Sequence, residues 1–207
     1  MRVGLAYNTV LPEVAAAQAA ALCTGSDKPF RALKHAVSSG HDSVVEHASF
    51  TFMIEGVSRV LLAQITRHRL ASFSVQSQRY CGVKPVWIVP PKIEELGFAD
   101  DYKAECDRCY RAFERYVAAG VPDEDARFVI PQGVECKLMM TMNARELKHF
   151  FSLRCCNRAQ WEIRELANSM LDIVRFGFPQ LFEDAGAPCV RGACPETRPC
   201  GKVKNDV

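Results

Sequence analysis

The chain has 207 residues, and 26 Lys and Arg against 24 Asp and Glu leave a formal net charge of +2. A nearly neutral chain disfavours histone-like proteins that hold nucleic acid through a global positive field, so any anion must be bound by a local cluster. With 48% hydrophobic and 24% charged residues, the composition is that of a folded protein and not of a disordered one.

Cysteine content and the amino-terminal sequence bear on the cellular compartment. Ten cysteines in 207 residues lie below the density of about 8–10% that marks a disulfide scaffold. The sequence opens with no basic segment followed by an apolar run, and no apolar run approaches the roughly 18 residues of a membrane helix. We therefore expect a cytoplasmic protein with reduced thiols and no membrane partner.

The first part of the chain is predicted to be mostly helical. An Ala-rich stretch that Pro opens predicts a helix over 12–23, and a second helix is expected over 30–38. Alternating Phe and Ile side chains indicate a half-buried strand over 48–55. The spacing of apolar residues then favours a helix over 57–66, whereas 70–80 is rich in Ser and Gln, lacks a clean period and is expected to be a loop.

The second part continues the mixture of helices and strands. An amphipathic helix is predicted over 101–118, and from residue 188 the composition shifts to Cys, Pro, Gly and Arg. We expect an α+β fold, a helix-dominated single domain over 1–187 with a small, mostly antiparallel sheet, followed by an irregular tail over 188–207. The other expected elements are strands over 84–89 and 132–142 and helices over 122–129, 143–155 and 158–176.

The most informative stretch starts with Arg67-His68-Arg69 at the end of an expected helix and continues through the Ser- and Gln-rich segment. A structural explanation exists, because cationic side chains favour helix C-termini, where they complement the macrodipole. However, a connecting loop does not need so many neutral donors and acceptors beside Arg79. Gln64 is expected on the same helix face as Arg67 and His68. Guanidinium, amide and hydroxyl groups together predict a pocket for a nucleotide.

The sequence resembles the flavin-dependent thymidylate synthases. Their signature is Arg-His-Arg, seven residues and then Ser, and Arg67-His68-Arg69 followed by Ser77 matches it without a gap. Further blocks match the family in order over roughly residues 40–180. These blocks are Glu46-His47, Asp125 to Pro131, Asn143-Ala-Arg145, His149, Leu153-Arg154 and Ala159 to Glu162.

The resemblance implies an enzyme that methylates dUMP to dTMP, with the carbon from methylenetetrahydrofolate and the electrons from NADPH through FAD. It also implies a homotetramer whose active sites lie between subunits. No Gly-x-Gly-x-x-Gly follows a strand, so the flavin site is not expected to be a Rossmann fold. The family's flavin contacts fall on His47, Ser49, Arg67, His68, Arg69, Asn143, Arg145 and His149. Its dUMP contacts fall on Gln64, Arg67, Gln76, Ser77, Gln78, Arg79, Arg127 and Arg154.

Arg154 is the candidate catalytic residue. Methylation at carbon five of uracil requires electron density there, and a guanidinium that stabilises negative charge on the imide and carbonyl groups makes the ring more nucleophilic. Arg suits this role because it stays protonated at any working pH and offers a rigid fork. The structural alternative is an Arg near a helix end that pairs with Glu162 or Glu165.

Structural explanations also exist for several flavin candidates. Asn143, followed three residues later by Glu146, resembles a capping box. Arg145 and His149 lie four residues apart on the predicted helix, so we expect both on one face. For His47, a core or capping role is the alternative.

Ser77 and the cysteines are nucleophilic side chains, but neither is assigned as a catalytic nucleophile. No His or acidic residue stands at a spacing from Ser77 that would form a charge-relay triad, so Ser77 is interpreted as a nucleotide-binding hydroxyl. The nearby Cys81 is expected to pack. Cys189, Cys194 and Cys200 leave a zinc site open as an alternative, but their spacings are not the usual Cys-x₂-Cys, and no metal is assigned.

Two other functions compete with the enzyme interpretation. A single-stranded nucleic-acid binder would use the cationic residues between Arg59 and Lys84, with Phe73, Tyr80 and Trp87 as stacking rings. The nearly neutral net charge weakens this interpretation, so no nucleic-acid partner is expected. The third possibility is a flavoenzyme of another class that reduces a different nucleotide.

Overall fold

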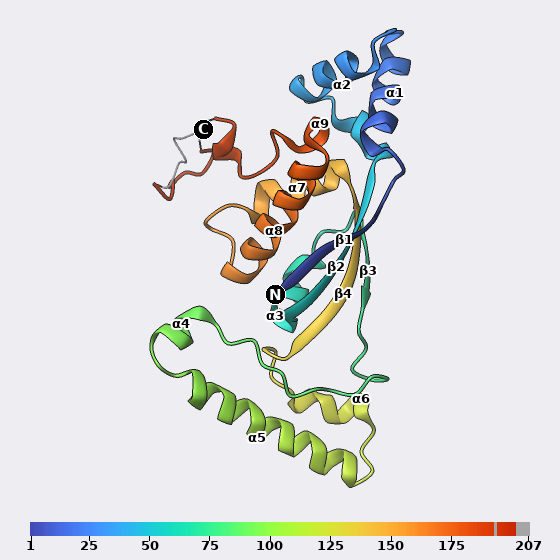
Figure 1. Ribbon diagram of the computed structural model, residues 1–207. Coiled ribbons are helices and arrows are strands. Elements are labelled where there is room, and N and C mark those ends of the chain that lie inside the picture. The colour runs from blue at the N-terminus through green and yellow to red at the C-terminus, as the bar shows by residue number, and fades with distance from the viewer. Residues whose placement is uncertain (193, 202–207) are drawn as a thin grey trace. The chain divides into compact units, whose positions relative to one another are not determined.

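The structure is a computed structural model that describes residues 1–192 and 194–201. It is rich in helices and contains one small antiparallel sheet (Figure 1), which confirms the predicted fold class. The chain divides into two compact units. Unit 1 contains residues 1–2, 54–67 and 74–138, and unit 2 contains 3–53, 68–73 and the described residues from 139 onward.

Four strands form the sheet in the order β1-β2-β4-β3. The alternation predicted for Phe50, Phe52 and Ile54 is confirmed, because all three side chains are fully buried along β2. Strand β4 alternates in the same way, with every second side chain buried. The bounds are Arg2–Asn8 for β1, Ser49–Ser58 for β2, Ala71–Val75 for β3 and Glu135–Asn143 for β4.

Two predictions about strands are wrong. The segment 70–80, expected as a loop, contains β3, an edge strand whose side chains alternate between exposed and half-buried. An edge strand needs no fully apolar face, so its Ser-rich sequence gives no clear period. The segment 84–89, expected as a strand, makes only an isolated bridge between Trp87 and Val134. Pro85 contributes to this, because proline cannot donate to a strand ladder.

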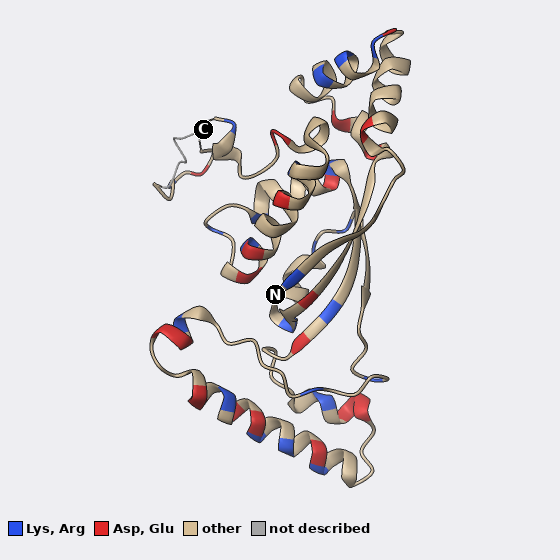
Figure 2. Cartoon of the chain, viewed as in Figure 1, with Lys and Arg blue, Asp and Glu red and all other residues tan. Residues whose placement is uncertain are grey.

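Unit 1 is built around a small apolar core and a long helix. Its core contains Val83, Phe113, Ala126 and Val134. The long helix confirms the prediction for 101–118 and carries charges of both signs along its length (Figure 2). The helices of this unit are α3 Arg59–Ile65, α4 Pro91–Glu95, α5 Ala99–Ala118, α6 Asp123–Ala126 and the 3₁₀ helix η2 Arg127–Val129.

The helix predicted over 57–66 begins two residues late, because β2 continues through Ser58. The Ser58 hydroxyl then caps α3 by accepting the N–H of Leu61 at 3.1 Å. This helix ends at Ile65, so the segment that follows it starts from a fixed point in unit 1.

Unit 2 has an aromatic core. Phe50 meets Phe178 and Phe182 edge-on, with ring centroids 5.0 and 5.3 Å apart. Helix α1 packs on α2, and α7 packs on α8 (Figure 1), which confirms the four helices predicted for this part of the chain. The helices are α1 Pro12–Thr24, α2 Pro29–Ser38, α7 Ala144–Arg154, α8 Trp161–Gly177, α9 Pro179–Phe182 and the 3₁₀ helices η1 Asp42–His47 and η3 Pro188–Val190.

Two kinds of feature are absent from the described residues. None of their helices combines the length and the apolar character that crossing a membrane requires. Among these residues, which include Cys189, Cys194 and Cys200, no three His, Cys, Asp or Glu side chains gather closely enough to hold a metal ion. The expected boundary between a domain over 1–187 and a tail over 188–207 stays a prediction.

Candidate functional site

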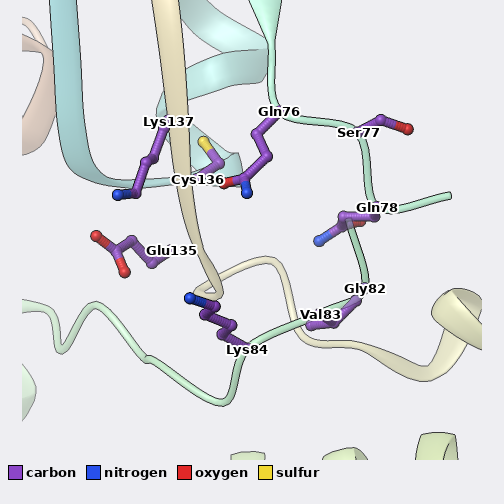
Figure 3. A pocket seen from close by; sticks show the side chains of 9 residues that line it. All are labelled: Gln76, Ser77, Gln78, Gly82, Val83, Lys84, Glu135, Cys136 and Lys137. Carbon is purple, nitrogen blue, oxygen red and sulfur yellow. The ribbon is translucent and has the colours of Figure 1, made fainter. Parts of the chain in front are cut away.

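The loop after β3 lines a hollow of about 80 Å³ in unit 1 (Figure 3). The backbone N–H of Gln76 donates to the carbonyl of Lys137 at 3.0 Å, which fixes the loop against β4. Figure 3 shows the Gln76 and Gln78 amides and the Lys84 ammonium around this space. The lining residues are Gln76, Ser77, Gln78, Gly82, Val83, Lys84, Glu135, Cys136 and Lys137.

Ser77 shapes this loop. Its hydroxyl points away from the other labelled side chains in Figure 3, and it accepts the backbone N–H of Arg79 at 3.1 Å. Such a contact between a serine and the residue two positions later stabilises a turn. Ser77 therefore helps to set the direction in which Arg79 leaves the loop, and its contact with a nucleotide stays a prediction.

Arg79 and Arg127, two predicted dUMP contacts, both contact Glu124. The guanidinium of Arg79 forms an ion pair with the Glu124 carboxylate at 2.5 Å. Arg127 donates from Nε to the backbone carbonyl of Glu124 at 3.1 Å. Two guanidinium groups that share one acidic residue form a local cationic cluster in which a phosphate can replace the carboxylate.

The Arg-His-Arg segment lies just past the end of α3, as predicted. The backbone N–H of Arg67 donates to the carbonyl of Gln64 at 3.4 Å, and Arg67 and Arg69 are exposed. The helix ends at Ile65, so Arg67 and His68 follow it and do not lie on it. The expectation that Gln64 shares a helical face with them is therefore wrong, although its predicted contact with dUMP is not affected.

Helix α7 presents three predicted flavin contacts to a hollow of about 650 Å³ in unit 2. Arg145 and His149 both line it, as their predicted shared face implies, and so does Asn143, the residue just before the helix. Asn143 also caps α7, because its Oδ1 accepts the N–H of Glu146 at 2.9 Å. The Arg145 guanidinium binds the Glu46 carboxylate, and this hydrogen bond raises the pKa of Arg145.

His68 lies in a buried hydrogen-bond network in unit 2. Its side chain is 4% exposed and that of Glu146 is 8% exposed. His68 Nδ1 lies 3.0 Å from Glu146 Oε1, and Arg154 donates from Nε to His68 Nε2 at 3.1 Å. Burial lowers the pKa of His68, and the Arg154 charge lowers it further, against the opposing effect of the Glu146 hydrogen bond.

His47 and Ser49 flank the start of β2. The His47 side chain is exposed at the end of η1, while its carbonyl accepts the Thr9 hydroxyl at 3.5 Å. The backbone N–H of Ser49 donates to the Thr9 hydroxyl at 2.9 Å. Neither residue is among those that line the 650 Å³ hollow, so their contacts with a flavin stay predictions.

Sequence reasoning did not find the partners of these residues. Glu146 stands 78 positions from His68, and no local spacing indicates that they meet. Lys148 is buried, and its ammonium lies 3.4 Å from Asp42 and 3.2 Å from Asp184. Burial of a lysine is the kind of feature that only tertiary structure reveals.

Arg158 contacts the segment after residue 188. It forms an ion pair with Glu196 at 3.4 Å and donates a hydrogen bond to the carbonyl of Arg198. Its side chain is thus engaged within unit 2.

The predicted contacts separate by unit. All predicted flavin contacts except Arg67 belong to unit 2, and all predicted dUMP contacts except Arg154 belong to unit 1. One unit thus carries the loop and the arginine cluster, and the other carries the large hollow and the buried network.

Comparison with known proteins identifies relatives along the whole chain. Residues 5–180 match the family model described as thymidylate synthase complementing protein. A flavin-dependent thymidylate synthase from Geobacter sulfurreducens is 45% identical over 98% of this chain and 95% of the relative. One from Clostridium tetani is 40% identical over 98% of this chain and 94% of the relative.

A solved structure is similar in fold. It is a flavin-dependent thymidylate synthase from Helicobacter pylori in complex with FAD and dUMP. The two structures align with a TM-score of 0.72 and 25% sequence identity, covering 90% of this chain and 100% of the other.

Proposed function

The chain belongs to the family of flavin-dependent thymidylate synthases, and from that premise we propose that it methylates dUMP to dTMP with FAD as its cofactor. This makes it an enzyme of the methyltransferase type. Methylenetetrahydrofolate is the proposed carbon donor and NADPH the proposed reductant. The carbon of that donor is at the methylene level, so forming a methyl group requires two further electrons, which NADPH supplies.

The observation that carries the proposal is the placement of Arg154. Its Nε is fixed by a buried imidazole, so the guanidinium is held in one plane. A fixed positive charge beside the uracil imide and carbonyl groups stabilises negative charge on them, which raises the electron density at carbon five and makes that carbon more nucleophilic. Arg154 is the proposed catalytic residue.

The hollow of unit 2 fits the flavin in its chemistry. Arg145 and His149 supply cationic or polar donors, and Asn143 supplies an amide, which together match the phosphate and ring-edge acceptors of a dinucleotide. We assign these three residues to FAD, together with His47, Ser49, Arg67 and Arg69 on the strength of the family resemblance. The resemblance also places His68 at the flavin, but Glu146 and Arg154 already hold both nitrogens of its ring, so any contact would have to be made without them. Bound FAD supplies hydride transfer, which no side chain can perform.

The nucleotide is assigned to the polar loop of unit 1. Arg79 and Arg127 are the proposed phosphate contacts, because both guanidinium groups contact the same residue, Glu124. Gln76 and Gln78 offer amides to a base or sugar. The other proposed dUMP contacts are Gln64, Arg67 and Ser77.

A homotetramer with active sites between its subunits is part of the proposal. It rests on the resemblance to the family. The cytoplasmic location stays a prediction from the sequence.

Purified protein tests the proposal directly. We expect it to bind FAD stoichiometrically and to form dTMP when dUMP, methylenetetrahydrofolate and NADPH are supplied. Omitting each component in turn should abolish the product. A protein that takes up no flavin but is retained on oligonucleotides would favour a nucleic-acid binder instead.

A further inference from the structure

Both ring nitrogens of His68 are held by side chains of α7. Nδ1 lies 3.0 Å from Glu146 Oε1, and Nε2 accepts the Arg154 Nε–H at 3.1 Å. Glu146, Phe150 and Arg154 follow one another at intervals of four residues, so they form one stripe of the helix. The His68 ring packs edge-on against Phe150, with centroids 5.0 Å apart. The imidazole thus joins a carboxylate to a guanidinium along this stripe.

The contacts fix the protonation state of His68. A guanidinium donates hydrogen bonds and never accepts them, so Nε2 carries a lone pair. The single ring proton then sits on Nδ1 and is donated to the Glu146 carboxylate. Burial favours this neutral ring, because it lowers the pKa of His68. The network is a carboxylate, a neutral imidazole and a guanidinium, in that order.

We propose that His68 and Glu146 are positioning residues that hold the guanidinium plane of Arg154 in the orientation in which it acts on the pyrimidine. The inference rests on the proposed function, because that function gives Arg154 its catalytic role. An arginine side chain is long and flexible, and anchoring Nε removes most of its freedom before the substrate binds. Glu146 contributes by holding the proton on Nδ1, which leaves the lone pair of Nε2 for Arg154.

A purely structural cluster would behave differently on substitution. If the network only stabilised α7, a variant that keeps the contact with Glu146 would have the same turnover as one that keeps the contact with Arg154. If the network positions Arg154, only the second contact preserves turnover. The two isosteric amides separate these cases, because the amide of Gln lies near the site of Nε2 and that of Asn lies near the site of Nδ1.

The experiment compares His68→Asn with His68→Gln. We expect His68→Asn, which loses the acceptor for Arg154, to lower kcat on the order of 10²-fold with little change in KM for dUMP. His68→Gln keeps an acceptor and should stay within about tenfold of the wild-type kcat. His41→Asn, at an exposed histidine outside the site, is the matched control and should keep wild-type turnover.

Equal losses of kcat in the two folded His68 variants, or a larger loss in His68→Gln, would overturn the proposal. If either variant fails to fold, ¹⁵N NMR of the His68 ring in wild-type protein without ligands decides. We expect a neutral ring with its proton on Nδ1 at neutral pH. A ring that is charged at neutral pH, or protonated on Nε2, contradicts the proposal.

The outcomes also separate this inference from the proposed function. A wild-type protein that forms no dTMP with all substrates present overturns both. An active wild-type protein whose two His68 variants lose turnover equally overturns the positioning role alone.

Discussion

In unit 1 the candidate nucleotide contacts lie on a polar loop and a short helix, and Arg79 and Glu124 are each about half exposed, at 48% and 47%. In unit 2 Arg154 is anchored by His68, whose side chain is almost completely buried. An exposed ion pair exchanges partners at little cost, whereas a buried network holds one geometry. The difference suits capture of a mobile nucleotide in the first region and stabilisation of a transition state in the second.

Removing the anchored guanidinium should have the largest effect. We expect Arg154→Ala to lower kcat on the order of 10²–10³-fold, because one preorganised charge is lost from the transition state. Flavin content, measured by absorbance, should remain at the wild-type level. Arg108→Ala, on the exposed surface of α5, is the control. Near-normal turnover in Arg154→Ala would remove this residue from the catalytic role.

Removing a loop-side guanidinium should act on binding and not on chemistry. We expect Arg79→Ala or Arg127→Ala to raise the Kd for dUMP roughly 10- to 100-fold, because each loses a charge-assisted hydrogen bond to phosphate. Calorimetric titration measures this, and FAD affinity should be unchanged. Arg145→Ala should show the reverse pattern, with weaker FAD binding and normal dUMP binding. Identical patterns in all three variants would contradict the division between the units.

The buried imidazole should make stability depend on pH. The pKa of His68 in the folded chain is lowered from its ordinary value of 6.5. At any pH between the folded and the unfolded pKa, the unfolded chain therefore binds more protons than the folded chain. The contribution of the neutral His68 ring to the free energy of unfolding is therefore complete above the pKa of the unfolded chain, and it declines as pH falls below about 6.5. Thermal melts should show a steeper decline in Tm for the wild type than for His68→Gln. Parallel declines would mean that His68 titrates normally.

The smallest effect is expected at Glu124. Glu124→Gln removes the carboxylate that competes with phosphate for Arg79, so the Kd for dUMP should fall a few-fold. The same titration measures it, with Glu105→Gln on α5 as the control. A weaker affinity would show that Glu124 supports the arginine cluster more than it competes with the ligand.

Local patterns predicted much of the site. The cap at Asn143 and the shared face of Arg145 and His149 follow from residue spacing alone, and the structure has both. The family signature covers the polar loop, and a separate matching block contains Arg154; their roles in the site stay predictions. These features depend on residues within one helix or one loop, where periodicity and capping chemistry are sufficient.

Contacts between distant segments could not be predicted in the same way. Nothing in the sequence near His68 indicates that Glu146 accepts a hydrogen bond from its ring. Residue spacing assigns Glu146 only to the cap of α7. Strand β3 was missed because an edge strand tolerates Ser at alternate positions. Strand β1, Arg2–Asn8, was also not anticipated. Pairing between remote segments is set by tertiary packing, which spacing does not encode.

A single-turnover measurement on the reduced flavoprotein tests the assigned reaction most directly. The protein is loaded with FAD, reduced with NADPH without oxygen, and mixed with dUMP and methylenetetrahydrofolate. We predict that the flavin absorbance returns and that one dTMP forms for each flavin reoxidised. Flavin that stays reduced, or that is reoxidised without dTMP, would contradict the account.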